Sequence, residues 1–205
     1  MSLDARQYAP ATQSNRQPIL AILKRILAQK ADILEIASGT GQHAVYFAQQ
    51  CPSWQWYPSD KSPICRDSIR AWSQFLSVDN IHPPLDIDAT QPFWDIEAQD
   101  IQIDAIVNIN MIHISPWSAC LGLMAGAKRI LPPGGILYLY GAFKRDGVHT
   151  APSNEAFDLS LKSRNPEWGV RNLEEVWQVA KSQSLDLQEI IEMPNNNLSV
   201  IWRKS

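Results

Sequence analysis

The sequence has little of what marks several large classes of protein. Its three cysteines, Cys51, Cys65 and Cys120, stand far apart, without the paired spacing of a metal site or of a disulfide framework. We therefore expect reduced thiols and no bound metal. Internal repeats and low-complexity tracts are also missing.

Excess positive charge is missing too. Lys and Arg number 18 against 21 Asp and Glu, which gives a net charge of -3. A protein that follows a phosphate backbone needs a basic surface, so we expect no nucleic-acid partner. The apolar stretch 19–27 is broken by Lys24 and Arg25 and is too short to span a bilayer, and residues 1–10 lack a secretory signal core. We expect a cytoplasmic protein with no membrane partner, as a monomer or a homodimer.

What is present is a pattern of alternating strands and helices. The 205 residues are 45% hydrophobic and 19% charged, which fits one globular domain over residues 1–205. Short apolar runs alternate with amphipathic stretches of helical period. The pattern predicts strands at 32–37, 54–58, 85–87, 104–112 and 136–140, and helices at 15–29, 42–50, 62–76, 115–131 and 173–184.

The end of the chain departs from this alternation. The apolar runs 185–192 and 198–203 are separated by only five residues, which is too short for a right-handed crossover, so they must pair antiparallel. A largely parallel sheet that ends in such a hairpin resembles the class I methyltransferases. We predict a Rossmann-like α/β sandwich with a mostly parallel seven-stranded sheet, a C-terminal antiparallel hairpin and helices on both faces.

Two segments lie outside the repeating units. Residues 1–30 are expected to form an N-terminal helical lid. Residues 144–171 are long, polar and rich in proline, asparagine and charge, and are expected to form an insertion with a short helix of its own. Because this insertion follows the carboxyl end of the fifth predicted strand, we expect it to border the acceptor site.

A glycine turn follows the first strand and opens a helix. Glycine lets the backbone approach a ligand closely, and the N–H groups of a helix N-terminus face that ligand. Gly39, Gly41 and Ala44 satisfy the dinucleotide fingerprint G-x-G-x-x-A, and Asp60 lies 19 residues beyond Gly41. An NAD(P)-dependent oxidoreductase therefore stays open as an alternative to a methyltransferase.

Three acids favour S-adenosylmethionine as the cofactor. Glu35 lies inside the first strand, near the expected methionine end of the cofactor, and Asp60 ends the second strand, where it can accept hydrogen bonds from ribose. Asp88 ends the third strand and suits the adenine amino group, or else caps the next helix. All three fall at carboxyl ends of strands, where open α/β sheets bind ligands.

Several segments resemble a small methyltransferase-like family, long described as a domain of unknown function, which includes methyltransferase-like protein 26. They are R-Q-Y-A-P-A-T-Q-S-N-R at 6–16, L-E-I-A-S-G-T-G-Q-H at 34–43, N-I-N-M-I-H-I-S-P-W at 108–117, L-P-P-G-G-I-L-Y-L-Y-G-A-F at 131–143, S-N-E-A-F-D at 153–158, N-P-E-W-G-V-R at 165–171 and M-P-N-N-N-L at 193–198. The resemblance covers nearly the whole chain. It implies the class I fold and S-adenosylmethionine binding, and it implies no particular acceptor.

The resemblance gives candidate residues for the cofactor site. These are Glu35, Gly39, Gly41, Asp60 and Asp88, to which we add Asn15, Arg16 and Asn108. Asn15 and Arg16 precede the first predicted helix, where they either close over the cofactor's carboxylate or cap the helix at the surface. Asn108 and Asn110 are two apart on a strand and should share one face. Asn110, or the backbone of the neighbouring Met111, is then a candidate for the methyl-transfer site.

His113 is the candidate general base, because imidazole titrates near neutral pH. Its alternative role is that of a structural hydrogen-bonding residue. In the insertion, the candidate acceptor contacts are Asn154, Glu155, Asp158, Arg164, Trp168 and Arg171, and their polarity suggests a small-molecule acceptor. The alternative is an internal ion-pair network that holds the insertion to the domain.

Two further functions remain possible. A module that binds S-adenosylmethionine without catalysis has the same cofactor motifs, so only tests of turnover would distinguish it. A nucleic-acid amino-methyltransferase is disfavoured, because the sequence reads N-I-N-M where that class carries an N-P-P-Y type motif.

Overall fold

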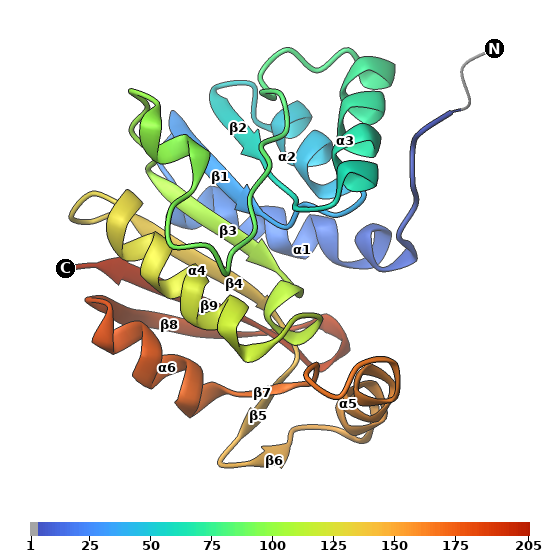
Figure 1. Ribbon diagram of the computed structural model, residues 1–205, viewed down its shortest axis with the longest axis vertical. Helices are drawn as coiled ribbons and strands as arrows, with labels where there is room; N and C mark the ends of the chain where they lie inside the picture. The colour runs from blue at the N-terminus through green and yellow to red at the C-terminus, as the bar shows by residue number, and fades with distance from the viewer. Residues whose placement is uncertain (1–3) are drawn as a thin grey trace.

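A mixed β-sheet forms the centre of the computed structural model, which describes residues 4–205 (Figure 1). Within these residues its six strands stand in the order β2-β1-β3-β4-β9-β8. The first four are parallel, whereas β9 runs antiparallel to both of its neighbours. The strands are β1 (Ala31–Ile36), β2 (Trp54–Pro58), β3 (Ala105–Ile109), β4 (Ile136–Gly141), β8 (Leu185–Met193) and β9 (Asn197–Lys204).

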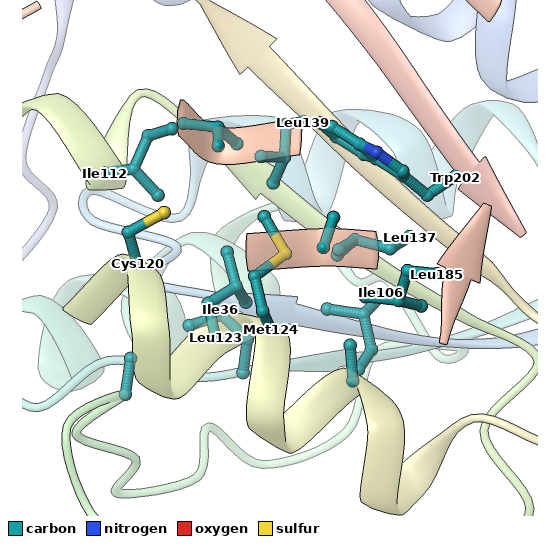
Figure 2. Close-up of a cluster of buried hydrophobic side chains, with 14 of the residues drawn as sticks. Ile36, Ile106, Ile112, Cys120, Leu123, Met124, Leu137, Leu139, Leu185 and Trp202 are labelled. Atoms are coloured by element: carbon teal, nitrogen blue, oxygen red, sulfur yellow. The ribbon is translucent and has the colours of Figure 1, made fainter. Parts of the chain in front are cut away.

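Helices cover both faces of the sheet because its strands are apolar on both sides. Ile33 and Val107 belong to a core with α1 (Pro10–Ile26) and α2 (Gln42–Gln50). Their chain neighbours Leu34 and Ile106 face the opposite side, toward α4 (Trp117–Ile130) and α6 (Leu173–Ser182). Figure 2 shows this second core, where Cys120, Leu123 and Met124 of α4 pack against sheet residues. α3 (Pro63–Leu76) packs beside α2.

The strand predicted at 85–87 does not form. Leu85 makes a single parallel bridge to Ser59, so residues 4–205 contain a six-stranded central sheet rather than a seven-stranded one. The preceding Pro83 and Pro84 supply no backbone N–H, which keeps the pairing from extending. The C-terminal hairpin is present as β8 and β9.

The helix predicted at 15–29 begins earlier, at Pro10, and ends at Ile26. Proline suits the first turn of a helix because its missing N–H has no partner there in any case. The predicted lid spans residues 1–30, of which 1–3 lie outside the described residues. No helix in residues 4–205 combines the length and hydropathy needed to cross a membrane.

The insertion at 144–171 builds a small second sheet beside the main one (Figure 1). Its strands are β5 (Phe143–Arg145), β6 (Val148–His149) and β7 (Arg171–Asn172), in the order β6-β5-β7, and α5 (Pro152–Arg164) is the predicted helix. Short 3-10 turns complete the elements at Asp95–Ala98, Met111–His113 and Pro194–Asn196.

Candidate functional site

A cavity of about 480 Å³ opens at the carboxyl ends of β1, β2 and β3. Parallel strands bring their following loops to the same edge of a sheet, which is why this cavity forms there. Its walls come mainly from five parts of the chain. They are residues 35–40 at the end of β1, residues 60–61 after β2, residues 87–89, residues 109–111 and 114–116 at the end of β3, and the first turns of α1. His43, Ala119 and Trp168 complete the wall.

Glu35 is the most deeply buried acid in the cavity wall, with 2% of its surface exposed. The indole N–H of Trp56 donates a hydrogen bond to Oε2 of Glu35 at 3.0 Å. Burial and, to a smaller extent, the nearby Asp60 charge raise the pKa of Glu35 to about 7, against the opposing effect of the hydrogen bonds from Trp56 and Ser38. Glu35 thus titrates near neutral pH and would become fully ionised beside a cation.

Asp60 joins the glycine turn to the start of α3. Its Oδ2 accepts the Gly39 N–H at 3.0 Å, and its Oδ1 accepts the Ser62 N–H at 2.8 Å. A carboxylate oxygen has a second acceptor position, so both oxygens can also receive hydroxyl groups from the cavity. A fixed carboxylate of this kind suits a vicinal diol such as that of ribose.

Asp88 begins a turn in the cavity wall rather than capping a helix, because its carbonyl accepts the Gln91 N–H at 3.0 Å. Its Oδ1 accepts the N–H and the hydroxyl of Thr90, at 2.9 and 2.8 Å. Lys61 lies 3.7 Å from the other oxygen. Burial opposes ionisation, but the Thr90 hydrogen bonds and the Lys61 charge outweigh it and lower the pKa of Asp88. Asp88 is therefore an ionised hydrogen-bond acceptor at neutral pH.

The two glycines of the turn have different roles. Gly39 lies in the cavity wall with φ of +55°, and it donates the hydrogen bond to Asp60. Gly41 has φ of +81° and lies behind the wall, where an added Cβ would come within 2.9 Å of the Ile69 backbone. Gly41 therefore allows α2 and α3 to pack closely and makes no contact with the cavity.

The start of α1 covers one side of the cavity, with Asn15 buried in its wall. Asn15 lies inside α1, so it is not a surface cap. Its Oδ1 lies 2.7 Å from Nε2 of His43, a cavity residue that sequence reasoning missed. Burial, helped by Arg16, lowers the pKa of His43 to about 3, so its ring is neutral and donates to Asn15. Arg16 stacks on Tyr46 instead of lining the cavity.

Asn108 and Asn110 do not act as a pair. Asn108 is buried between strands, and its side-chain amide donates to the Ile36 carbonyl at 2.9 Å, outside the cavity wall. Asn110 follows the end of β3 with φ of +63° and lines the cavity. The alternation of faces ends with the strand at Ile109, so the two side chains lie in different places.

His113 lies behind the cavity and is completely buried. Its carbonyl accepts the Gly169 N–H at 2.9 Å, and its Nδ1 faces the Arg171 N–H at 3.4 Å. Burial, aided by the Arg171 charge, lowers the pKa of His113 to about 3. This is the environment of a structural hydrogen-bonding residue, and the general-base role has no support from the geometry.

The predicted acceptor contacts of the insertion separate into distinct groups. Trp168 reaches the cavity wall, and the exposed Arg164 stacks on its outer side at 5.4 Å. Glu155 is exposed and lies outside the cavity wall. Arg171 donates to the carbonyl oxygens of Ile112 and Ser115, which ties the insertion to the loop after β3.

Asp158 is the centre of an ion-pair network. This is the role that the sequence left open as the alternative to contact with the acceptor. Its carboxylate is 3% exposed and lies 2.7 Å from Lys162, 3.3 Å from Lys144 and 3.3 Å from His149. It also accepts the Val170 N–H at 2.8 Å. Asp158 thus holds α5, β5, β6 and the following loop together, away from the 480 Å³ cavity.

The remaining residues that sequence reasoning missed are mostly apolar or small. Besides His43 and Lys61, the cavity wall includes Ala9, Ala11, Thr12, Ile36, Ala37, Ser38, Thr40, Ile87, Ala89, Ile109, Ile114, Ser115, Pro116 and Ala119. Residues of this kind carry no chemical signature in a sequence. Only their position next to the predicted acids would have indicated them.

Several solved structures with this fold are described as methyltransferases. One is an O-methyltransferase family protein from Burkholderia thailandensis, 14% identical, with a TM-score of 0.79 over 95% of this chain and 57% of that chain. Human N-acetylserotonin methyltransferase, solved in complex with S-adenosylmethionine, is 14% identical with a TM-score of 0.76 over 95% and 53%. An O-methyltransferase family 2 protein from Planctomyces limnophilus, in complex with apigenin, is 19% identical with a TM-score of 0.73 over 95% and 60%.

At these identities the likeness establishes an α/β fold that resembles the class I methyltransferases. The chain spans little more than half the length of these three proteins. Residues 6–204, nearly the whole chain, match the family described as "Protein of unknown function (DUF938)". The protein therefore belongs to the DUF938 family.

Proposed function

We propose that this protein transfers a methyl group from S-adenosylmethionine to a small-molecule acceptor. The observation that carries the proposal is the 480 Å³ cavity, in which Glu35, Asp60 and Asp88 stand at the carboxyl ends of successive strand segments. The sheet has the antiparallel C-terminal hairpin expected of a methyltransferase. The resemblance to methyltransferase-like protein 26 supports the same proposal.

The residues of the cavity fit the cofactor part by part. Asp60 would accept the ribose hydroxyls, and Asp88 would accept the adenine amino group between the apolar side chains of Ile87 and Ala119. Glu35 and Asn15 would hold the charged methionine end. The ammonium group there would lower the pKa of Glu35 from about 7 and leave it ionised.

The cofactor supplies an activated methyl group, and the protein's contribution is to position the acceptor. Asn110 and the backbone of Met111 line the cavity beyond the end of β3, where an acceptor would approach. Well-oriented reactants gain up to ~7–11 kcal/mol from positioning. A protein base is not required for this, which agrees with the buried and neutral state of His113.

Two alternatives compete with methyl transfer. An NAD(P)-binding oxidoreductase is disfavoured because a dinucleotide spreads over both halves of a doubly wound parallel sheet. Here, the half beyond β4 is made by the antiparallel β9 and its hairpin partner β8. A module that binds S-adenosylmethionine without turnover would have the same cavity, so it is distinguished by an acceptor screen.

Parallel calorimetric titrations with S-adenosylmethionine, S-adenosylhomocysteine and NADH test the proposal. We expect both sulfur compounds to bind with micromolar dissociation constants and NADH to give no heat of binding. Binding of NADH alone would assign the protein to the oxidoreductases. Tight binding of S-adenosylmethionine without methyl transfer to any member of an acceptor panel would favour the alternative, a module that binds the cofactor without catalysis.

A further inference from the structure

A second cavity adjoins the first one at the carboxyl end of β4. It encloses about 410 Å³ between the start of α1, α5 and the turn that joins β8 to β9. Asn15 and Asn110 stand in the walls of both cavities. A molecule in the second cavity therefore meets the proposed methionine end of the cofactor across these two asparagines.

The second cavity carries no formal charge in its wall. Its polar lining consists of six asparagines, two serines and Tyr140, whose pKa is raised by burial, so that its hydroxyl stays protonated. Phe157, Ala11 and Ala142 add an apolar surface. The first cavity, by contrast, contains Glu35, Asp60, Lys61 and Asp88.

Hydrogen bonds within the protein decide which polar groups remain free. Both N–H groups of the Asn154 amide are used, by Oγ1 of Thr150 and by the Asn196 carbonyl, each at 2.9 Å. Asn197 donates to the Tyr140 hydroxyl at 3.0 Å and to the Pro194 carbonyl at 3.4 Å.

The carbonyl oxygens Oδ1 of Asn154 and Asn197 receive no donor from residues 4–205, yet neither atom is sealed inside the protein. The second cavity therefore presents hydrogen-bond acceptors to a ligand. Free acceptors suit O–H and N–H groups, and a wall without a Lys, Arg or His leaves the charge of a carboxylate or phosphate uncompensated.

We propose that the second cavity binds the methyl acceptor, and that this acceptor is a small molecule with hydroxyl or amino donors and no negative charge. The proposal rests on the proposed methyltransferase function. The acceptor's oxygen or nitrogen forms a bond to the methyl carbon as the bond from that carbon to sulfur breaks and its electron pair stays on sulfur. The acceptor's proton then leaves to water.

Three probes with one ring and different polar groups test this chemistry. Benzyl alcohol, benzylamine and benzoate are titrated into protein saturated with S-adenosylhomocysteine. We expect saturable binding of the alcohol or the amine in the millimolar range, at least about tenfold tighter than benzoate. Whichever of the two binds identifies the donor. Benzoate binding as tightly, or no saturable binding of either donor probe, would overturn the proposal.

A change of charge at the rim tests the location. Asn195 lines the second cavity and is exposed, but its φ of +60° favours asparagine, so Asn195→Lys should keep the fold at a small cost in stability. We expect this variant to gain benzoate binding and to lose benzylamine binding at least about tenfold. Ser160→Lys adds the same charge to the exposed surface of α5, outside the cavity wall, and should leave the preference unchanged.

The affinity for S-adenosylhomocysteine is measured in the same samples and separates the two hypotheses. If it binds and Asn195→Lys leaves the probe preference as in the wild type, the second cavity is not the acceptor site. If S-adenosylhomocysteine itself does not bind, the proposed function is wrong.

Discussion

At the scale of single residues, the buried Glu35 carboxyl makes stability depend on pH. Its pKa of about 7 in the folded protein lies above the ordinary value of 4.5. The folded state therefore binds more protons than the unfolded state between these values, and its free energy of unfolding falls as the pH rises from 4.5 to 7. Below this pH range the cost of ionising the buried Glu35 carboxyl does not reduce stability, and above it this cost is present in full.

Glu35→Gln should remove this pH dependence in the cofactor-free protein, because the glutamine side chain does not titrate. Its amide oxygen can still accept the Trp56 N–H, so the local structure should be kept. The stability of the variant relative to the wild type should rise between pH 4.5 and 7 and then level off. Urea unfolding across this pH range measures the difference. A constant difference would show that Glu35 titrates normally.

Asp60→Ala should weaken binding of S-adenosylhomocysteine at least about tenfold, the effect of losing hydrogen bonds to a charged group. It should also lower stability by about 1–3 kcal/mol, because the N–H groups of Gly39 and Ser62 lose their acceptor. Titration calorimetry and urea unfolding measure the two effects. Asp67→Ala, at an exposed carboxylate of α3, is the matched control and should change neither.

The sequence predicted the acids of the site better than the histidine. Glu35, Asp60 and Asp88 all lie in the cavity wall. The first two were predictable because the carboxyl end of a buried strand can be recognised from its apolar run, whereas Asp88 follows a segment that makes only a single bridge. His113 and Asn108 are near the same ends, but they lie behind the wall. Whether a side chain after a strand faces the cavity depends on its φ and ψ, because the alternation of faces ends with the strand. This applies to His113, whereas Asn108 lies inside β3 and faces the neighbouring strand β1.

At the scale of elements, the N-terminal segment is held over the cavity by a few polar contacts. The Gln7 N–H donates to Ser68 of α3, and the Trp72 indole N–H donates to the Gln7 carbonyl at 2.9 Å. The Ala9 N–H donates to Gln42 of α2. These contacts position the first turns of α1, which form one wall of the 480 Å³ cavity.

Trp72→Phe should loosen this segment while preserving the aromatic contact with Tyr8. Loss of one hydrogen bond, about 0.5–1.5 kcal/mol, corresponds to a roughly two- to tenfold faster release of S-adenosylhomocysteine. Surface plasmon resonance measures the release rate. Trp177→Phe changes a partly exposed tryptophan of α6 and serves as the control. Equal release rates in all three proteins would mean that the segment does not retain the cofactor.

The insertion at 144–171 is likewise held in place by polar contacts, which centre on Asp158. Asp158→Ala should lower the free energy of unfolding by about 2–4 kcal/mol, because Lys144, Lys162 and the Val170 N–H lose their acceptor. Burial opposes ionisation, yet these partners lower the pKa of Asp158, so the stabilisation is lost as the pH falls below 3.8. Urea unfolding tests both statements, and the exposed Glu155→Gln should cost less than about 1 kcal/mol.

Most elements follow from hydrophobic periodicity, whereas their ends do not. The predicted strand at 54–58 and helix at 42–50 agree with β2 and α2. The start of α1 at Pro10 and the loss of a strand at 85–87 depend on contacts with α2 and on the missing N–H groups of Pro83 and Pro84. The contact of Ala9 with Gln42 connects distant segments, so a local pattern cannot reveal it, whereas the two prolines are visible in the sequence and should have weakened the strand prediction.

At the scale of the whole molecule, two adjoining cavities at one edge of the sheet are the basis of the proposed function. The charged cavity beside β1–β3 suits the cofactor, and the uncharged cavity beside β4 suits the acceptor. The cytoplasmic location and the monomeric or dimeric state stay predictions, and light scattering of the purified protein tests the second. The antiparallel pairing of β8 with β9 was predictable because the residues between them are too few for a crossover.

A crystal structure of the complex with S-adenosylhomocysteine tests the central claim most directly. The account predicts the ligand in the 480 Å³ cavity, its ribose hydroxyls within hydrogen-bond distance of Asp60, its adenine beside Asp88 and its sulfur toward Asn110. A complex with the ligand bound elsewhere, or with the Asp60 carboxylate not in contact with ribose, would contradict it.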